Sequence, residues 1–320
     1  MSNKVVIIGA GYVGATIGYA LMNQGITSEI VLIDLDKDKA EGEAMDLNHG
    51  AAFVKPVKVR NGDYKDCENA DLIIITAGAN QKPGESRLDL VKKNTGILKN
   101  IVPSITEYNK ETILLVVTNP VDILTYVTYK LSGFPSHRVM GSGTVLDTSR
   151  FRYLLSEHCN LDPRNVHAYI IGEHGDSEVA AWSLTNVAGI PFDRYCEMCQ
   201  DEFSDSCENE KRDKFKNDIS KKVKESAYKI IEKKGATYYA IGLAVSRITE
   251  SIFRDENTIL TVSSVFKDIY GIEEVALSLP TVVNSSGVKN VLSLEINKKE
   301  KDEFIDSANM INDIIKDLEI

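Results

Sequence analysis

The chain has 320 residues, of which 43% are hydrophobic and 26% are charged, a balance typical of globular proteins and unlike that of disordered chains. Acidic residues outnumber basic ones by 47 to 37, and the net charge of -10 disfavours nucleic acid and anionic membranes as partners. No apolar run approaches the ~20 residues that span a bilayer, and the strand expected from Val5 leaves no room for a signal peptide before it. Five cysteines, an odd number, indicate reduced thiols. We therefore expect a soluble, cytoplasmic protein.

Short apolar runs and helical patterns alternate along the first 140 residues. Several of the runs are apolar at consecutive positions, which is typical of strands buried on both faces. Alternation of such strands with helices favours a doubly wound parallel sheet. The expected strands cover residues 5–8, 30–33, 57–59, 72–75 and 113–117, and the expected helices cover 13–24, 37–48, 88–109 and 120–131.

The pattern changes after about residue 143. Helical patterns dominate near 145–158 and 211–253, and strands return around 166–171. Residues 258–266, 274–283 and 287–292 predict an antiparallel meander, and an amphipathic helix is expected over 298–317. The predicted fold class is therefore α/β, with a Rossmann-type doubly wound parallel sheet in residues 1–142 and a C-terminal α+β domain in residues 143–320.

A glycine motif, Gly9-Ala10-Gly11-Tyr12-Val13-Gly14, lies between the first expected strand and the first expected helix. Gly9 permits a tight turn, Gly11 lets a pyrophosphate approach the backbone, and Gly14 lets the helix pack closely on the strand. Asp34 ends the second strand, where a carboxylate would accept hydrogen bonds from a ribose diol and repel a 2′-phosphate. The motif predicts that residues 1–142 bind NAD in preference to NADP.

Two polar segments in the second half could supply reacting groups. His174 lies between glycines at the end of an expected strand, and Asp147 and Arg150 share one face at the start of an expected helix. Asp147 could hold a histidine tautomer, and Arg150 could bind a carboxylate in a bidentate manner. Spacing alone leaves a purely structural histidine equally open.

Two further segments follow strands of the predicted sheet. Residues 76–87 combine glycine and proline with polar side chains, a composition that suggests a mobile lid. Residues 117–122 follow the fifth strand and end on the ligand-binding edge of the sheet.

These motifs, in this order and spacing over essentially the whole chain, resemble the lactate/malate dehydrogenase family, and most closely its bacterial members that act on lactate. The resemblance implies that His174 is the catalytic acid and base, Asp147 its partner, Arg150 the clamp on the substrate carboxylate, and Arg87 the lid arginine that polarises the carbonyl. It implies that Asn119 orients the substrate and that Thr237 lines its pocket. Further cofactor contacts are implied for Val13, Lys39, Tyr64, Gly78, Ala79, Val117, Asn119 and Ser142.

Gln81 discriminates between substrates. Malate enzymes of this family have an arginine here that pairs with the second carboxylate of oxaloacetate, a pair that a neutral glutamine cannot form. We therefore expect pyruvate and lactate as the substrate pair, although a longer neutral 2-keto acid remains open. Lys82 is the alternative cation, and we assume from the Pro83-Gly84 register that it points elsewhere.

Arg152 and His167 match positions at which bacterial lactate enzymes bind fructose 1,6-bisphosphate between subunits. Two cations per subunit, doubled by a two-fold axis, would suit a bisphosphate. We therefore expect this effector and a homo-oligomer, either a tetramer or a dimer–tetramer equilibrium. An ordinary surface arginine and a strand histidine are the alternative.

Three other interpretations are set against this one. Tyr126 and Lys130 have the Tyr-x-x-x-Lys spacing of short-chain dehydrogenases, but the glycine pattern does not suit that family. Cys196, Cys199 and Cys207 lack a second ligand pair, so we expect ordinary thiols and no metal. A catalytically silent NAD-binding protein would not need the reacting residues that the resemblance implies, which are Arg87, Asn119, Asp147, Arg150 and His174.

Overall fold

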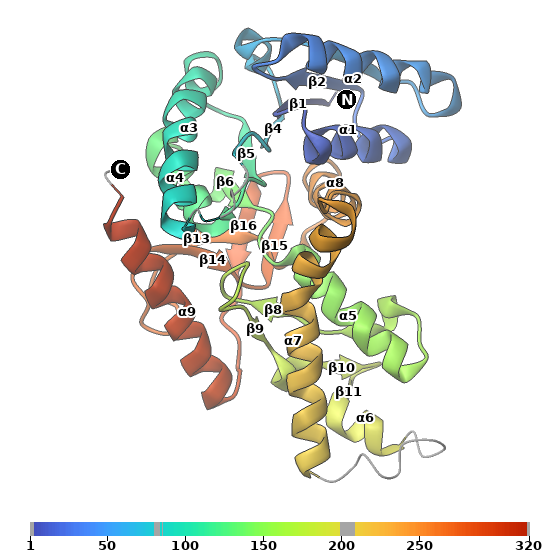
Figure 1. The fold of residues 1–320 in the computed structure, drawn as a ribbon, viewed down its shortest axis with the longest axis vertical. Coiled ribbons are helices and arrows are strands. Elements are labelled where there is room, and N and C mark those ends of the chain that lie inside the picture. Colours follow the sequence, from blue (N-terminus) through green and yellow to red (C-terminus); the bar gives the residue numbers. More distant parts are fainter. Residues whose placement is uncertain (1–2, 80–83, 85, 199–208, 319–320) are drawn as a thin grey trace.

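A single eight-stranded sheet forms the centre of the computed structural model, which describes residues 3–79, 84, 86–198 and 209–318 (Figure 1). The strand order is β14-β13-β6-β5-β4-β1-β2-β3. Six adjacent strands of this sheet come from the first half of the chain and run parallel to one another, so the predicted doubly wound α/β fold is confirmed. These strands are β1 (Lys4–Ile8), β2 (Glu29–Ile33), β3 (Lys58–Asn61), β4 (Leu72–Ile75), β5 (Ile113–Val116) and β6 (Val139–Gly141), the last of which the sequence analysis missed.

Helices cover both faces of this sheet, and alternate side chains of each strand point to opposite helical layers. Val6 and Ile8 belong to the hydrophobic core that α3, α4 and α9 cover, whereas Val5 and Ile7 belong to the core under α1, α2 and α8. Burial on both faces explains why these strands are apolar at consecutive positions. The helices are α1 (Tyr12–Gln24), α2 (Lys37–His49), α3 (Arg87–Tyr108), α4 (Val121–Ser132), α8 (Tyr239–Phe253) and α9 (Lys298–Lys316).

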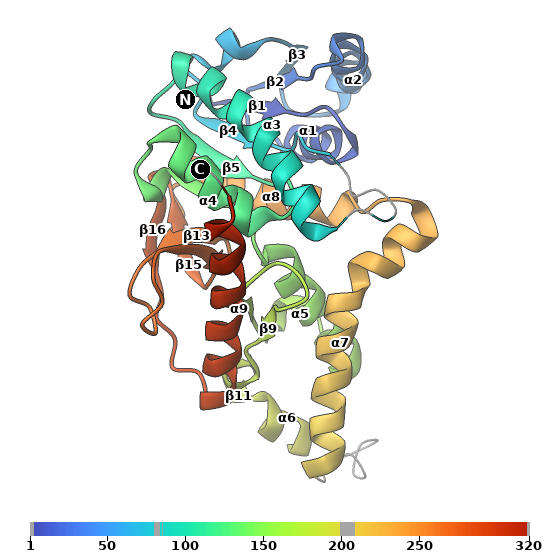
Figure 2. The same ribbon diagram turned by 60° about the vertical axis from the view of Figure 1, so that its left-hand side comes forward.

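The remaining elements lie below the sheet in the view of Figure 2, where α7 runs along the side of the lower part. A third hydrophobic core, around Phe151 and Phe192, joins α5 to α7 and to two small sheets, β11-β10-β7 and β8-β9. These elements are α5 (Val145–Cys159), β7 (Val166–His167), β8 (Ile170–Ile171), β9 (Val179–Ala180), β10 (Asn186–Val187), β11 (Ile190–Pro191), α6 (Phe192–Met198) and α7 (Asn209–Lys234).

Two expectations for the second half need correction. The helical stretch expected over 211–253 is two helices, because Gly235 has a φ of +84°, a left-handed conformation that ends α7. The expected single meander is also wrong, although its strands do pair antiparallel. β13 (Ser263–Phe266) and β14 (Val275–Ser278) extend the central sheet, whereas β12 (Thr258–Leu260), β15 (Thr281–Asn284) and β16 (Gly287–Val291) form a sheet of their own.

Pro280 explains part of that change of sheet, because it stands between β14 and β15 and has no N–H to continue a strand ladder. Short 3-10 helices complete the described elements: η1 (Ala51–Phe53), η2 (Tyr64–Cys67), η3 (Ser136–Arg138), η4 (Pro163–Asn165) and η5 (Trp182–Leu184). Within the described part of the chain, no helix is both long enough and apolar enough to cross a membrane.

Phe304 packs α9 against the central sheet, so removal of its ring should substantially lower the free energy of unfolding. The ring is 0% exposed and lies 6.4 Å from the Phe266 ring and 5.7 Å from the Tyr270 ring, centroid to centroid. We predict that Phe304→Ala lowers the free energy of unfolding by about 3–5 kcal/mol, measured by urea denaturation. Phe53→Ala is the matched control, because that ring is 89% exposed. Equal losses in the two variants would contradict this account.

Candidate active site

The carboxyl ends of the parallel strands form one edge of the sheet, and the glycine motif lies there between β1 and α1. Gly9 has a φ of +109°, and a Cβ atom there would lie 2.6 Å from the Ala77 backbone nitrogen. A Cβ atom on Gly14 would lie 1.9 Å from the Gly9 carbonyl oxygen. Gly11, in contrast, has no atom of the described residues within 4 Å of that position, which leaves the backbone at the start of α1 open to a ligand on that side.

Asp34 is tied to this motif by hydrogen bonds. Its Oδ2 accepts from the Ala10 N–H at 2.6 Å, and its Oδ1 accepts from the Asp36 N–H at 3.0 Å. The carboxylate is thereby held beside the N-terminus of α1, where the helix dipole and open N–H groups favour a pyrophosphate. These residues fit NAD, with the pyrophosphate at Gly11 and the ribose hydroxyls at Asp34.

The other expected cofactor positions also lie at or near this edge. Asn94, a buried side chain of α3 that the sequence analysis missed, joins two of its loops: Oδ1 accepts from the Ala79 N–H at 2.8 Å, and Nδ2 donates to the Asn119 carbonyl at 2.8 Å. Each expected cofactor position follows one of the parallel strands: β1 (Val13), β2 (Lys39), β3 (Tyr64), β4 (Gly78, Ala79), β5 (Val117, Asn119) and β6 (Ser142).

His174, Asp147 and Arg150 form one hydrogen-bonded cluster. Asp147 Oδ2 lies 2.5 Å from His174 Nδ1, and its Oδ1 accepts from Arg150 Nη1 at 2.7 Å. Asp147 and Arg150 lie three residues apart on the first turns of α5, so they share the face that meets the loop after β8. Bonding at Nδ1 leaves Nε2 of His174 as the ring nitrogen available to a substrate.

The protonation of this cluster follows from its charges. Burial of the His174 imidazole lowers its pKa, but the Asp147 carboxylate outweighs burial and, together with Asp122 and Glu178, raises the pKa to about 9. Burial likewise raises the pKa of Asp147, but His174 and Arg150 outweigh it and hold that pKa below its usual range. His174 is therefore protonated at neutral pH and able to donate a proton.

Family models match almost the entire chain: "lactate/malate dehydrogenase, NAD binding domain" matches residues 3–141, and the "alpha/beta C-terminal domain" of the same family matches residues 144–319. The chain belongs to the lactate/malate dehydrogenase family. It is an NAD-dependent 2-hydroxy acid dehydrogenase.

Individual relatives agree with this membership. An L-lactate dehydrogenase of Acetivibrio thermocellus is 59% identical over 317 residues, which cover 99% of this chain and 98% of the relative. L-lactate dehydrogenase 1 of Clostridium acetobutylicum is 57% identical over 98% of this chain and 97% of its own. Among solved structures, a lactate dehydrogenase from a deep-sea metagenome is 47% identical, with a TM-score of 0.93 and 99% of each chain covered. The ligand-bound minor L-lactate dehydrogenase of Enterococcus mundtii is 44% identical, with a TM-score of 0.93, covering 100% of this chain and 99% of its own.

Asp122 connects the dehydrogenase's two halves at this site, which the sequence analysis did not foresee. It lies in the first turn of α4, and its Oδ2 accepts from the His174 backbone N–H at 2.7 Å. The residues are 52 positions apart, and no local pattern marks them as partners. A helix at the cofactor edge thus holds the loop that carries His174.

Thr237 lies between α7 and α8, next to a stack of aromatic rings. The Tyr238 ring stacks on Tyr12 of the glycine motif at 5.4 Å between centroids, and Lys234 Nζ lies 3.6 Å from the Tyr238 centroid. This stack brings the segment that carries Thr237 against the cofactor edge.

Several expected residues lie wholly or partly outside the part of the chain that the structure describes. Gln81 and Lys82 lie outside the described residues, as do Cys199 and Cys207, and the side chains of Arg87 and Cys196 lie outside them as well. The Arg87 backbone begins α3, which Ser86 caps by accepting the Asp89 N–H at 3.1 Å.

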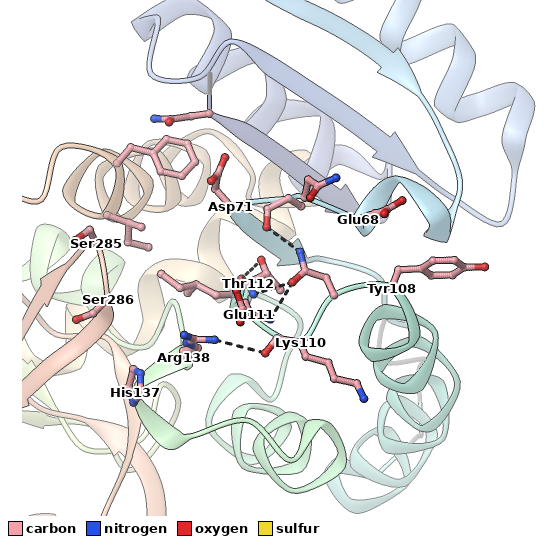
Figure 3. Close-up of a pocket in the computed structure, with 17 residues that line it drawn as sticks. Glu68, Asp71, Tyr108, Lys110, Glu111, Thr112, His137, Arg138, Ser285 and Ser286 are labelled. Carbon is pink, nitrogen blue, oxygen red and sulfur yellow. Dashed lines mark hydrogen bonds between the residues drawn. The ribbon is translucent and has the colours of Figure 1, made fainter. Parts of the chain in front are cut away.

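A cavity of about 790 Å³ lies at the opposite, amino-terminal edge of the sheet (Figure 3). It is lined by residues that precede β1, β4, β5 and β6, among them Asn3, Asp71, Thr112 and Arg138. Arg138 donates to the Lys110 carbonyl at 3.5 Å, and the lining mixes acidic and basic side chains. None of the expected catalytic or cofactor residues whose side chains the structure describes lines this cavity.

The raised pKa of His174 gives a test of the cluster that needs no substrate. In Asp147→Asn the carboxylate charge is lost while burial remains, so we predict that the pKa of His174 falls from about 9 to about 6.5 or lower. Proton NMR titration of the imidazole measures it, with the resonance identified from a His174→Gln variant. Asp193→Asn, remote from His174 and paired with Lys216, is the control and should leave the midpoint in place. An unchanged midpoint in Asp147→Asn would disprove the assignment.

Proposed function

We propose that the protein is an L-lactate dehydrogenase that reversibly reduces pyruvate to (S)-lactate with NADH. The observation that carries the proposal is the hydrogen-bonded cluster of His174, Asp147 and Arg150, tied by Asp122 to the helix that begins at the cofactor edge. The L-lactate dehydrogenases of Acetivibrio and Clostridium, which share more than half of its residues, support the choice of substrate. Pyruvate reduction regenerates NAD, which a fermentative cell requires, and we place the protein in the cytoplasm.

The proposed reaction requires a hydride on C2 of pyruvate and a proton on its oxygen. The reduced nicotinamide, when bound, supplies the hydride. His174 donates the proton from Nε2, and Asp147 stabilises the imidazolium until transfer occurs. In lactate oxidation the neutral imidazole accepts the proton instead, so the same pair serves both directions.

Arg150 has the chemistry to bind the substrate's carboxylate. Its bond to Asp147 uses Nη1 and leaves other N–H groups of the guanidinium fork for a carboxylate, which fixes the distance from C2 to the cofactor. Asn119 and Thr237 would orient the substrate from the cofactor edge and from the α7–α8 segment. Arg87, at the start of α3, would stabilise negative charge on the ketone oxygen.

We also propose a division of labour along the chain. Residues 1–142 bind the cofactor, with NAD preferred over NADP because Asp34 would repel a 2′-phosphate. Residues 143–320 supply the acid–base pair and the carboxylate clamp, so the reaction takes place where the two parts meet.

Substrate choice depends on residue 81 in this proposal. The second carboxylate of oxaloacetate would lie unpaired beside neutral Gln81, so pyruvate should be the better substrate. We predict that Gln81→Arg lowers kcat/KM for pyruvate and raises it for oxaloacetate, changing the ratio by at least about 100-fold. NADH absorbance with each keto acid measures both values. Lys82→Ala is the control and should keep the wild-type preference. A wild-type preference for oxaloacetate would disprove the proposal.

A second part of the proposal concerns activation by fructose 1,6-bisphosphate. Arg152 Nε donates to the Ala168 carbonyl at 3.0 Å, and the preceding residue, His167, is exposed on β7. Burial lowers the pKa of Arg152, and no carboxylate of the described residues acts against that shift. A phosphate group would supply the missing negative charge. Two such pairs around a two-fold axis would stabilise a tetramer, or shift a dimer–tetramer equilibrium towards it.

This effector site predicts a selective loss of activation. In the double variant Arg152→Gln/His167→Gln, the bisphosphate concentration for half-maximal activation should rise by at least about tenfold, because two cationic contacts per subunit are lost. Initial rates and light-scattering mass, each with and without the bisphosphate, measure activation and assembly. Arg164→Gln, an exposed arginine already paired with Asp162, is the matched control. Activation that persists in the double variant would refute the site.

A further inference from the structure

Glu178 is a buried acid beside the catalytic cluster for which the mechanism above has no use. It ends the loop that carries His174, immediately before β9, which pairs with β8. Its backbone N–H donates to the Gly175 carbonyl at 3.2 Å, which closes the loop on itself. The residue is only 5% exposed, and its Oε1 has no hydrogen-bond partner among the described residues.

Such a carboxyl group is costly to ionise. A buried carboxylate needs donors or cations to offset the hydration that it loses, and an oxygen without a donor forgoes part of that compensation. Glu173, also buried in this loop, differs in that its Oε2 accepts from Ser177 Oγ at 2.5 Å. The burial of Glu178 and the missing donor at Oε1 therefore favour its protonated form.

Charged groups act on Glu178 from two neighbouring helices, α5 and α7, and from its own loop. They are Asp147 and Arg150 of α5, His174 of the loop, and Lys224 of α7, whose Nζ donates to the Asp176 carbonyl of the same loop at 3.0 Å. Asp122 of α4 accepts the His174 backbone N–H at 2.7 Å. Burial and Asp147 raise the pKa of Glu178 to about 8, against the opposing effects of His174, Lys224 and Arg150.

The charge of the whole group depends on this proton. Among the groups named above, protonated Glu178 leaves three cations (His174, Arg150 and Lys224) with the two carboxylates of Asp147 and Asp122, a balance that favours an anion. Ionisation of Glu178 releases its proton to solvent and cancels that excess, so Arg150 attracts a substrate carboxylate less strongly.

We propose that Glu178 is a positioning residue of the dehydrogenase that carries a proton in the active enzyme, and that loss of this proton weakens binding of the substrate carboxylate at Arg150. The inference rests on the proposed pyruvate reduction and deepens it. It assigns to Glu178 the alkaline limit of substrate binding, separately from the proton that His174 transfers.

Glu178→Gln tests the inference, because glutamine keeps the shape of the protonated acid at every pH. At saturating NADH, we expect KM for pyruvate to rise with pH through two coupled ionisations in the wild type and through one in the variant. The limiting slope of log(kcat/KM) against pH should change from -2 to -1. The KM of the wild type should exceed that of the variant by about tenfold at pH 9, one unit above the pKa of Glu178.

Two further variants separate charge from structure. Glu178→Asp keeps an ionisable carboxyl group and should restore the steeper limb. Glu300→Gln replaces another glutamate, only 4% exposed, whose carboxylate accepts hydrogen bonds from Ser183 instead of facing the cluster, and should follow the wild-type profile. The pH dependence of NADH binding, followed by cofactor fluorescence, should be the same in Glu178→Gln as in the wild type. If Glu178→Gln shows the same slope of log(kcat/KM) against pH and the same KM at pH 9 as the wild type, the inference is overturned.

A measurement on the wild type keeps the test independent of folding of the variants and of the substrate. Infrared difference spectra should show the C=O band of a protonated buried carboxyl group at pH 7 that is lost with a midpoint of about pH 8. Absence of that band would overturn the inference even if pyruvate is reduced. A band that titrates in a protein that does not reduce pyruvate would instead show that the proposed function had failed.

Discussion

The carboxylate of Asp147 is the group on which the candidate active site depends. It is 2% exposed, and such a charge is tolerable only because His174 and Arg150 each contribute a cation and a hydrogen bond to it. Each of the two cations is in turn held by this one carboxylate. Removal of any member leaves an uncompensated buried charge, so the orientation of the imidazole and the position of the guanidinium are linked. The start of α5 and the loop after β8 consequently have a single arrangement relative to one another.

The position of this cluster relative to the cofactor edge is set by the central sheet. Asp122, at the start of α4, accepts the His174 backbone N–H, and Gly172, two residues before His174, exchanges backbone hydrogen bonds of 2.9 and 3.0 Å with Ser278 of β14. β14 belongs to the eight-stranded sheet that also carries the glycine motif. His174 and the cofactor edge are therefore both attached to the central sheet, as the sub-ångström positioning of the proposed hydride transfer would require.

Three carboxyl groups surround one imidazole, and their environments give them different parts. Asp147 stays ionised because it bonds directly to two cations, and Asp122 accepts a backbone N–H. Glu178 is buried without a donor at Oε1, so it keeps its proton to a higher pH. Burial and hydrogen bonding alone can thus keep one carboxyl group of a cluster ionised and another protonated.

The order of elements, the parallel sheet and the glycine turn with Asp34 could be read from the sequence, because apolar periodicity and turn chemistry are local properties. The same holds for the Asp147–Arg150 spacing, which one helical turn determines. The division of 211–253 at Gly235, the change of sheet around Pro280, and the short β6 could not, since a single glycine, proline or three-residue strand is decided by its surroundings. The roles of Asn94, Asp122 and Glu178 could not be predicted either. The hydrogen-bond partners of Asn94 and Asp122 lie far along the chain, and Glu178 is distinguished only by its burial. The order of amino acids is sufficient to show which chemical groups exist and on which elements they lie. Which of the buried acids meet His174 follows from the packing of distant elements, because the free energy of a buried charge depends on the groups around it.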